Sequence, residues 1–418
     1  MWFGGPLAVC GLWVVACGTG PVGNGQVGGT PNTAAGVAGT SGAGTGAGGG
    51  SGAGQAGGGV AGVELVGGAA GAAGSVGTGG APPIVLDESL RKRAADGMVP
   101  LQNWYNQNTG LFDKNDWWTS GNQLEAVIDY TRETGDIQYL ADIDNTFAKN
   151  SSKNFDKWGF YDDDGWWCIV WIKAYDLTKQ QKYLDMAKVI FKRMADSWDT
   201  KCKGGIYWRN AKDKKNAIPN TLFMQAAAKL HLRTPGDMGA GSYLDWSQRT
   251  WTWFKGSGLL QANKLIYDTL DNLTDCQAEG PVFTYNQGVA VGALTDLAAA
   301  SGDDSLLDEA SAVVHGTMSL MQVNGILKEA PCGGEVCTQF KGVFFRNLLL
   351  FYRVRPAADI QTYMRAHSDR IWSFSRNDKN QFGYEWHLPA FDGPSVMRQG
   401  SALDALIAAY AASNPLPK

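Results

Sequence analysis

The stretch Tyr-Asp-Asp-Asp-Gly-Trp-Trp-Cys-Ile-Val-Trp at residues 161–171 joins three consecutive carboxylates to two tryptophans and an apolar run. In a helix over residues 164–177, Trp167, Trp171 and Ala174 share one face, which is the spacing of a helix that packs against a core. The sequence therefore predicts an acidic cluster at the start of a buried helix, and similar helix starts recur along the chain.

The acidic cluster alone is compatible with more than one role. Neighbouring like charges and an aromatic wall raise the proton affinity of a carboxyl group, so one acid can hold a proton while another is ionised. Sugar hydrolysis needs such a pair, and tryptophan faces also stack on pyranose rings. Aspartates before a helix are equally common as caps of its free N–H groups. A calcium loop is disfavoured, because no acidic residue follows at the position that closes its cage.

The apolar spacing predicts an all-α domain with few strands. Turns followed by Tyr-Leu or Leu-Leu pairs, as at residues 134–140 and 301–307, indicate a weak repeat of helical hairpins. Six hairpins favour an (α/α)6 toroid with alternate helices inside, against an irregular all-α domain or an open solenoid. A short hairpin is expected near residues 204–208. The predicted helices are 87–105, 117–134, 136–150, 164–177, 180–197, 217–232, 242–257, 285–300, 304–322, 339–354, 358–376 and 399–412.

Alternate predicted helices begin with clusters of polar and aromatic residues. The inner helices of a barrel of hairpins all start at the same end, so these clusters would ring one mouth of the barrel. Hydrogen-bonding groups and aromatic faces around a common cleft suit a sugar better than an apolar ligand. The clusters begin at residues 117, 162, 216, 284, 339 and 398.

These motifs, taken in order, resemble glycoside hydrolase family 76, the endo-α-1,6-mannanases and their relatives. The resemblance covers nearly all of the predicted folded part. It rests on Asp-Asp-x-x-Trp-Trp at residues 162–167, Gly-Gly-Ile-Tyr-Trp at 204–208, Lys-Asn-Ala-Ile-Pro-Asn at 215–220, Thr-Tyr-Asn-Gln-Gly at 284–288, and Phe-Lys-Gly at 340–342 followed by Arg-Asn-Leu at 346–348. It implies an (α/α)6 barrel, retaining hydrolysis of α-1,6-linked mannose chains, two adjacent catalytic aspartates, and no metal or other cofactor.

The resemblance also implies roles for single residues. Asp162 matches the family nucleophile and Asp163 the general acid/base, whereas Asp164 falls where the family varies and is interpreted as a cap or a supporting group. Asp268 resembles a position that contacts sugar near the cleavage point. We expect the helix N-terminus to keep Asp162 ionised. The other candidate substrate-binding residues are Trp117, Trp118, Asn122, Trp166, Trp167, Trp208, Asn220, Tyr285, Asn286, Gln287, Lys341 and Arg346.

Most of these binding candidates have an alternative structural role. The tryptophans can be core residues, and Tyr285, Asn286 and Gln287 can be a hydrogen-bonded helix start. Lys341 and Arg346 can pair with acids on neighbouring hairpins instead of lining the cleft. The histidines are expected to be structural or exposed, and their spacing does not suit a zinc site; they are His231, His315, His367 and His387.

The composition of residues 1–83 predicts an export signal followed by a flexible linker. Residues 1–17 resemble a bacterial lipoprotein signal with Cys17 as the lipidated residue, although no Lys or Arg precedes the apolar run. Residues 18–83, almost all Gly, Ala, Ser and Thr, are expected to be a disordered linker, and residues 84–418 the glycoside hydrolase domain. This predicts a secreted or cell-surface protein with possible membrane attachment through Cys17.

Cysteine pairing and partners complete the expectations. Cys332 and Cys337 are placed for a local disulfide, Cys202 and Cys276 can pair with each other, and Cys168 is expected to be a buried free thiol. A net charge of −4 argues against a nucleic-acid partner. The expected partner of the monomer is a mannan polysaccharide or its oligosaccharides. Transglycosylation on mannan or GPI-type glycans and glycan binding without catalysis stay open as alternatives.

Overall fold

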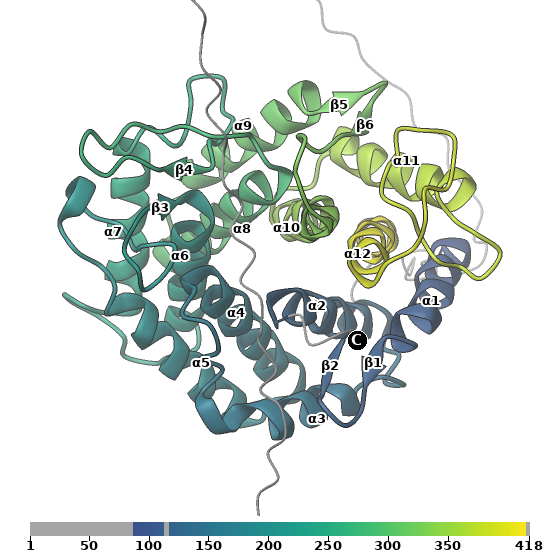
Figure 1. The fold of residues 1–418 in the computed structure, drawn as a ribbon, viewed down its shortest axis with the longest axis horizontal. Helices are drawn as coiled ribbons and strands as arrows, with labels where there is room; N and C mark the ends of the chain where they lie inside the picture. The colour runs from purple at the N-terminus through teal and green to yellow at the C-terminus, as the bar shows by residue number, and fades with distance from the viewer. Residues whose placement is uncertain (1–86, 113–116, 415–418) are drawn as a thin grey trace, which may run out of the picture. The chain divides into compact units, whose positions relative to one another are not determined.

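The computed structural model describes residues 87–112 and 117–414, and in these ranges twelve α-helices form a ring (Figure 1). The predicted export signal with Cys17 and the predicted linker over residues 18–83 lie outside the described residues. The helices are α1 (Glu88–Gln102), α2 (Trp117–Thr134), α3 (Ala141–Asn150), α4 (Tyr161–Thr178), α5 (Gln181–Ala195), α6 (Ala217–His231), α7 (Tyr243–Gly256), α8 (Thr284–Ser301), α9 (Ser305–Leu320), α10 (Phe340–Val354), α11 (Ala358–Phe374) and α12 (Val396–Ser413).

The even-numbered helices form the inside of the ring and the odd-numbered helices the outside (Figure 1). Each of α2, α4, α6, α8, α10 and α12 packs against the next, and α12 packs back against α2. Each outer helix leads into the inner helix that follows it, so all six inner helices begin at the same end, here called the mouth. The predicted (α/α)6 toroid is confirmed, and the contact between α12 and α2 rules out an open solenoid.

Glycines near the mouth allow the inner helices to approach closely. A Cβ atom on Gly288 of α8 would lie 2.5 Å from the Cα atom of Phe344 in α10. A Cβ atom on Gly342 of α10 would lie 2.5 Å from the Cα atom of Ser401 in α12. Because protein interiors leave no spare space of this kind, these two contacts between helices exist only with glycine at both positions.

The start of α4 differs from the prediction by three residues. The helix begins at Tyr161, with Phe160 in an extended conformation as its N-cap, so the three aspartates belong to its first turn. The N-cap residue is Phe160, whose side chain makes no cap hydrogen bond, so none of the three aspartates is the N-cap. The Asp162 carboxylate nevertheless accepts a hydrogen bond from the first-turn N–H of Asp163. Two other helix starts also differ from the prediction. The helix α3 begins five residues later than predicted, at Ala141, and α12 begins three residues earlier, at Val396.

Short antiparallel strand pairs join the helices around the ring. They are β1 (Tyr105–Asn106) with β2 (Leu111–Phe112), β3 (Lys215–Asn216) with β4 (Thr269–Leu270), and β5 (Gln322–Val323) with β6 (Ile326–Leu327). The hairpin expected at residues 204–208 does not form. This segment is instead a loop followed by a single bridge between Phe160 and Arg209.

The cysteines of the described residues behave as the sequence suggested. Cys202 pairs with Cys276, Cys332 pairs with Cys337, and Cys168 is a buried free thiol. Across residues 87–112 and 117–414, no helix is long and apolar enough to cross a membrane. The same ranges hold no group of three or more His, Cys, Asp or Glu side chains that is placed to bind a metal ion.

Candidate active site

Asp162 lies in the first turn of α4, at the mouth, and accepts two hydrogen bonds. The indole Nε1 of Trp208 donates to its Oδ2 at 2.8 Å, and the backbone N–H of Asp163 donates to its Oδ1 at 3.0 Å. Burial raises the pKa of Asp162 to about 7, although both bonds act to lower it. The expected effect of the helix N-terminus is therefore outweighed: desolvation, not the helix dipole, dominates the proton affinity of Asp162.

The three consecutive aspartates separate into two environments. Asp163 is 7% exposed and follows Asp162 on the same helix turn. Asp164 instead faces α5, where Nε and Nη2 of Arg193 donate to its two carboxylate oxygens at 2.9 and 2.6 Å. Burial raises the pKa of Asp164 to about 6 against the effect of Arg193. The role of Asp164 is thus to join two helices, as a supporting group.

Asp268 lies just before β4 and is held by polar side chains from two helix starts. Asn286 Nδ2 donates to its Oδ1 at 2.9 Å, and Asn216 Nδ2 donates to its Oδ2 at 3.1 Å. Burial raises the pKa of Asp268. The pKa of the Tyr285 phenol is raised by its own burial and by the negative charges of Asp268 and Asp162. Both carboxylates therefore lie within electrostatic reach of one tyrosine at the mouth.

An arc of aromatic rings follows the mouth from α4 to α8. Trp166 stacks on Trp118 with ring centroids 5.9 Å apart, and Trp118 lies 6.2 Å from Phe340. Phe340 stacks on Tyr285 at 3.9 Å, with the ring planes 5° apart. Trp118 and Tyr285 are partly exposed, as is Trp208 beside Asp162. Phe340 was not among the candidate residues, although its place at a helix start next to Lys341 was a usable signal.

Trp117 and Trp167, two of the candidate substrate-binding residues, lie in the core and not on the surface of the mouth. Trp167 is fully buried and Trp117 is 3% exposed. The ring centroids of the two tryptophans lie 4.9 Å apart. The ring centroid of Phe155 lies 5.7 Å from that of Trp117 and 4.9 Å from that of Trp167. These two rings form the core between the inner helices and the loop that carries Phe155, so they present no face to the mouth.

The side-chain amides of Asn220 and Gln287 each hold a loop by bonding both the N–H and the carbonyl of one loop residue. Asn220 accepts a hydrogen bond from the N–H of Ile206 at 2.8 Å and donates to its carbonyl at 3.0 Å. Gln287 bonds both backbone groups of Ile266 in the same way, at 2.9 and 3.0 Å. Two residues after each anchored isoleucine stands a mouth residue, Trp208 or Asp268. Both amides therefore position site residues from behind.

The loop that carries Trp208 has a second anchor. Lys215 is fully buried, and burial lowers its pKa. Its ammonium group donates hydrogen bonds of 2.7–2.9 Å to a carboxylate and three loop carbonyls, those of Asp199, Lys201, Gly204 and Gly205.

Asn122 and Arg346 belong to a buried polar network below the mouth. Arg346 pairs with Glu125 of α2 and, at 3.1 Å, with Asp404 of α12, and it donates to Asn122 Oδ1 at 2.6 Å. All four side chains are at most 7% exposed. The alternative predicted for Arg346, pairing with acids on neighbouring hairpins, is therefore the observed one.

Lys341 is enclosed on the far side of the mouth. It donates to the carbonyl of Tyr384 and lies 4.2 and 4.1 Å from the ring centroids of Tyr384 and Trp386. Burial lowers its pKa to about 7. Nearby, Glu329 accepts hydrogen bonds from Thr284 at the start of α8, and burial raises its pKa to about 7. No motif of the sequence points to Glu329, because it stands in a loop outside all of them.

The chain resembles known proteins over most of its length. Residues 89–418 match the family model described as glycosyl hydrolase family 76. The chain is 24% identical over 351 residues to the mannan endo-1,6-alpha-mannosidase DCW1 of Saccharomyces cerevisiae, covering 75% of this chain and 76% of the yeast protein. A putative mannan endo-1,6-alpha-mannosidase of Schizosaccharomyces pombe is 27% identical over 232 residues, which is 49% of this chain and 50% of that protein.

Solved structures show the same fold. An inactive variant of the α-1,6-mannanase of Salegentibacter sp. HEL1_6, with two consecutive aspartates replaced and α-1,6-mannotriose bound, superimposes with a TM-score of 0.69. It is 22% identical, covering 77% of this chain and 99% of that one. Dfg5 from Chaetomium thermophilum, in complex with glucosamine, gives a TM-score of 0.70 at 19% identity, covering 79% and 91% of the two chains. The family match spans most of the described helices, and the chain belongs to glycosyl hydrolase family 76.

Proposed function

We propose that this protein is an endo-acting α-1,6-mannanase that works with retention of anomeric configuration. The observation that carries the proposal is the pair Asp162 and Asp163 on one turn of α4, at a mouth lined by aromatic rings. The family and the mannan endo-1,6-alpha-mannosidases among its relatives support the choice of substrate.

In the proposed mechanism Asp162 attacks the anomeric carbon while Asp163 gives a proton to the leaving glycosidic oxygen. A covalent glycosyl-enzyme results. Asp163, now ionised, then takes a proton from a water molecule, and that water displaces Asp162 from the sugar. Only ionised Asp162 can attack. Since its pKa is raised to about 7 in the free protein, the rate is expected to rise as the pH increases through neutrality.

The groups around the pair are proposed to bind the polysaccharide. The partly exposed rings of Trp118, Trp208 and Tyr285 offer faces for sugar stacking, and Asp268 offers carboxylate oxygens for sugar hydroxyls. Trp166, beside Trp118 in the aromatic arc, supports that stack from below.

The proposed place of action is outside the cytoplasm. Two disulfides form among the described residues, and disulfides persist in oxidising compartments. Lipidation of Cys17 and export through residues 1–17 remain predictions from the sequence. We expect a monomer, because the ring of helices closes within one chain.

Incubation of the protein with linear α-1,6-mannan tests the proposal. Chromatography is expected to show a ladder of short oligosaccharides early in the reaction, which is the signature of internal cleavage. Release of mannose alone would contradict endo action, products longer than the starting chains would indicate transglycosylation, and an unchanged polysaccharide would contradict catalysis.

A further inference from the structure

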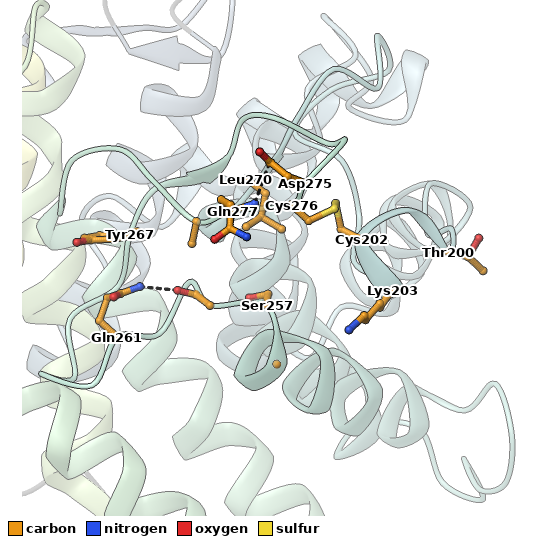
Figure 2. Close-up of a pocket in the computed structure, with 13 residues that line it drawn as sticks. Thr200, Cys202, Lys203, Ser257, Gln261, Tyr267, Leu270, Asp275, Cys276 and Gln277 are labelled. Carbon is orange, nitrogen blue, oxygen red and sulfur yellow. Dashed lines mark hydrogen bonds between the residues drawn. A yellow bond between two sulfur atoms is a disulfide. The ribbon is translucent and has the colours of Figure 1, made fainter.

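A cavity of about 770 Å³ lies behind the segment that carries Asp268 (Figure 2). The disulfide between Cys202 and Cys276 joins two of its walls. Tyr267 lies across the cavity from Lys203, and Gln277 lies between them in the view of Figure 2. Pockets of roughly 300–1,000 Å³ hold small organic ligands, so the space suits a short oligosaccharide.

The cavity is separate from the mouth but shares a wall with it. Asp268 is bonded to Asn286 and Asn216 on the mouth side, whereas its neighbour Tyr267 lines the cavity. Successive side chains of an extended segment point to opposite sides, which explains how adjacent residues serve two spaces. Leu270, in the cavity wall, pairs with Lys215 in the ladder of β3 and β4.

The lining groups fit a neutral ligand with many hydroxyl groups. The Tyr267 hydroxyl, the side-chain amide of Gln277 and the Lys203 ammonium form no hydrogen bond or ion pair with another described residue, and Gln277 and Lys203 are exposed at the opening of the cavity. Lys203 and Asp275 are the charged lining residues, and their charges cancel. One cation and one carboxylate make a weak site for a phosphate or a metal ion, whereas amide, phenol and ammonium donors suit sugar hydroxyls.

We propose that this cavity is a second binding site for a mannose oligosaccharide, so that the protein holds one stretch of its polysaccharide there while another stretch occupies the mouth. The inference rests on the proposed function for the identity of the sugar. Tyr267 supplies a ring face, and Gln277 and Lys203 supply hydrogen bonds to hydroxyl groups.

The test uses the full chain with Asp162→Asn and Asp163→Asn, labelled with 3-fluorotyrosine and titrated with α-1,6-mannotriose. The fluorine signals of Tyr267 and Tyr285 are assigned from their loss in Tyr267→Phe and Tyr285→Phe, and they report the cavity and the mouth respectively. We expect two saturation curves with different midpoints. Gln277→Ala and Lys203→Met should each weaken the Tyr267 curve by about tenfold, as expected for a lost hydrogen bond of about 1.4 kcal/mol.

The Tyr285 midpoint should stay within about twofold in these variants, and Gln181→Ala, an exposed glutamine at the start of α5, should change neither curve. The inference is overturned if the Tyr267 signal does not move, or if its curve is unchanged by both cavity substitutions, because the signal would then be relayed from the mouth. Hydrolysis of linear mannan by the wild-type protein tests the proposed function separately. A response at Tyr267 without hydrolysis would leave the cavity site standing and remove the catalytic proposal.

Discussion

The protonation of Asp162 depends on a balance between burial and two donated hydrogen bonds. Burial and, to a smaller extent, the charge of Asp164 disfavour the carboxylate, and the Trp208 indole and the Asp163 backbone N–H favour it. Trp208 in turn is held by a loop that Asn220 fixes through Ile206. The proposed nucleophile is thus tuned by an indole that sits on another segment of the chain.

Replacing Trp208 with Phe removes the indole donor and keeps most of the ring. The pKa of Asp162 should rise further, so the acid limb of the kcat/KM profile should move to higher pH. At pH 6, one unit below the Asp162 pKa of about 7, the wild type should stand about tenfold below its plateau in kcat/KM. The variant should stand at least about a hundredfold below its own plateau, since hydrogen bonds to charged groups contribute about 1.5–3 kcal/mol, or at least about one pKa unit. Trp158→Phe, at a half-exposed tryptophan, is the matched control. An acid limb that coincides with that of the wild type would remove Trp208 from this role.

The sequence could predict a site residue where its position at a helix start decides whether its side chain reaches the mouth. The acidic pair, the aromatic starts and Asp268 stand in ordered motifs, and the structure brings them to one end of the ring. Neighbouring residues on a helix point about 100° apart, so a sequence cannot tell which of Trp117 and Trp118 faces the mouth. Trp117 and Trp167 pack on Phe155, which stands in a loop. Hydrophobic periodicity predicts helices and strands but not the path of such a loop, so this packing could not be predicted.

At the scale of elements, loops and helices are joined by single buried side chains. His367 of α11 accepts a hydrogen bond from the N–H of Leu327 in β6 at 2.8 Å and bonds the Tyr363 carbonyl through its other ring nitrogen at 2.7 Å. It is fully buried, and burial lowers its pKa to about 3. His367 is therefore neutral in the folded protein and protonates more readily after unfolding.

Because the pKa of His367 is lowered in the folded protein, its contribution to the free energy of unfolding should depend on pH. The stabilising effect of neutral His367 is fully present above its unfolded pKa, near 6.5, and is lost progressively as the pH falls toward about 3. Urea unfolding should show that His367→Gln is destabilised relative to the wild type at pH 7.5 and that the difference in unfolding free energy shrinks at pH 4.5. The exposed His315→Gln should show no such narrowing. A difference that is constant with pH would contradict the neutral buried histidine.

Gly288 tests the close packing of α8 on α10. Gly288→Ala would place a Cβ atom against the backbone of Phe344, where no flexible side chain can move aside, so the free energy of unfolding should fall by about 3 kcal/mol or more. Gly256→Ala, in α7 with open space around the new methyl group, should be neutral or raise it by about 0.5–1 kcal/mol. Chemical denaturation of both variants measures the difference, and equal effects would contradict a packing role for Gly288.

The whole molecule depends on closing the ring between its first and last inner helices. Arg346 of α10 bonds Glu125 of α2 and Asp404 of α12, so one guanidinium spans the closure. The pair with Glu125 joins residues 221 positions apart in the sequence. The hairpin repeat could predict a toroid, but the polar groups that fill its interior could not be paired from sequence alone.

Arg346→Leu should therefore destabilise the molecule strongly. It would leave Asp404 buried without a cation and Glu125 with Lys173 as its remaining partner, and breaking such a buried pair costs about 3–5 kcal/mol. Arg355→Leu removes a solvent-exposed pair with Asp308 and should cost no more than about 1 kcal/mol. Thermal unfolding monitored by circular dichroism compares the two, and similar melting temperatures would contradict a role for Arg346 in closing the ring.

The catalytic proposal depends most directly on Asp162 and Asp163, and kinetics on linear α-1,6-mannan with NMR detection of the first product tests it. The wild type should release α-anomers first, and Asp162→Asn and Asp163→Asn should each lower the rate by about a thousandfold or more. Asp164→Asn, which weakens the two hydrogen bonds from Arg193 and removes one negative charge near Asp162, should remain within about tenfold of the wild type. Products that appear first as β-anomers, or activity within tenfold of the wild type in either Asp162→Asn or Asp163→Asn, would contradict the account.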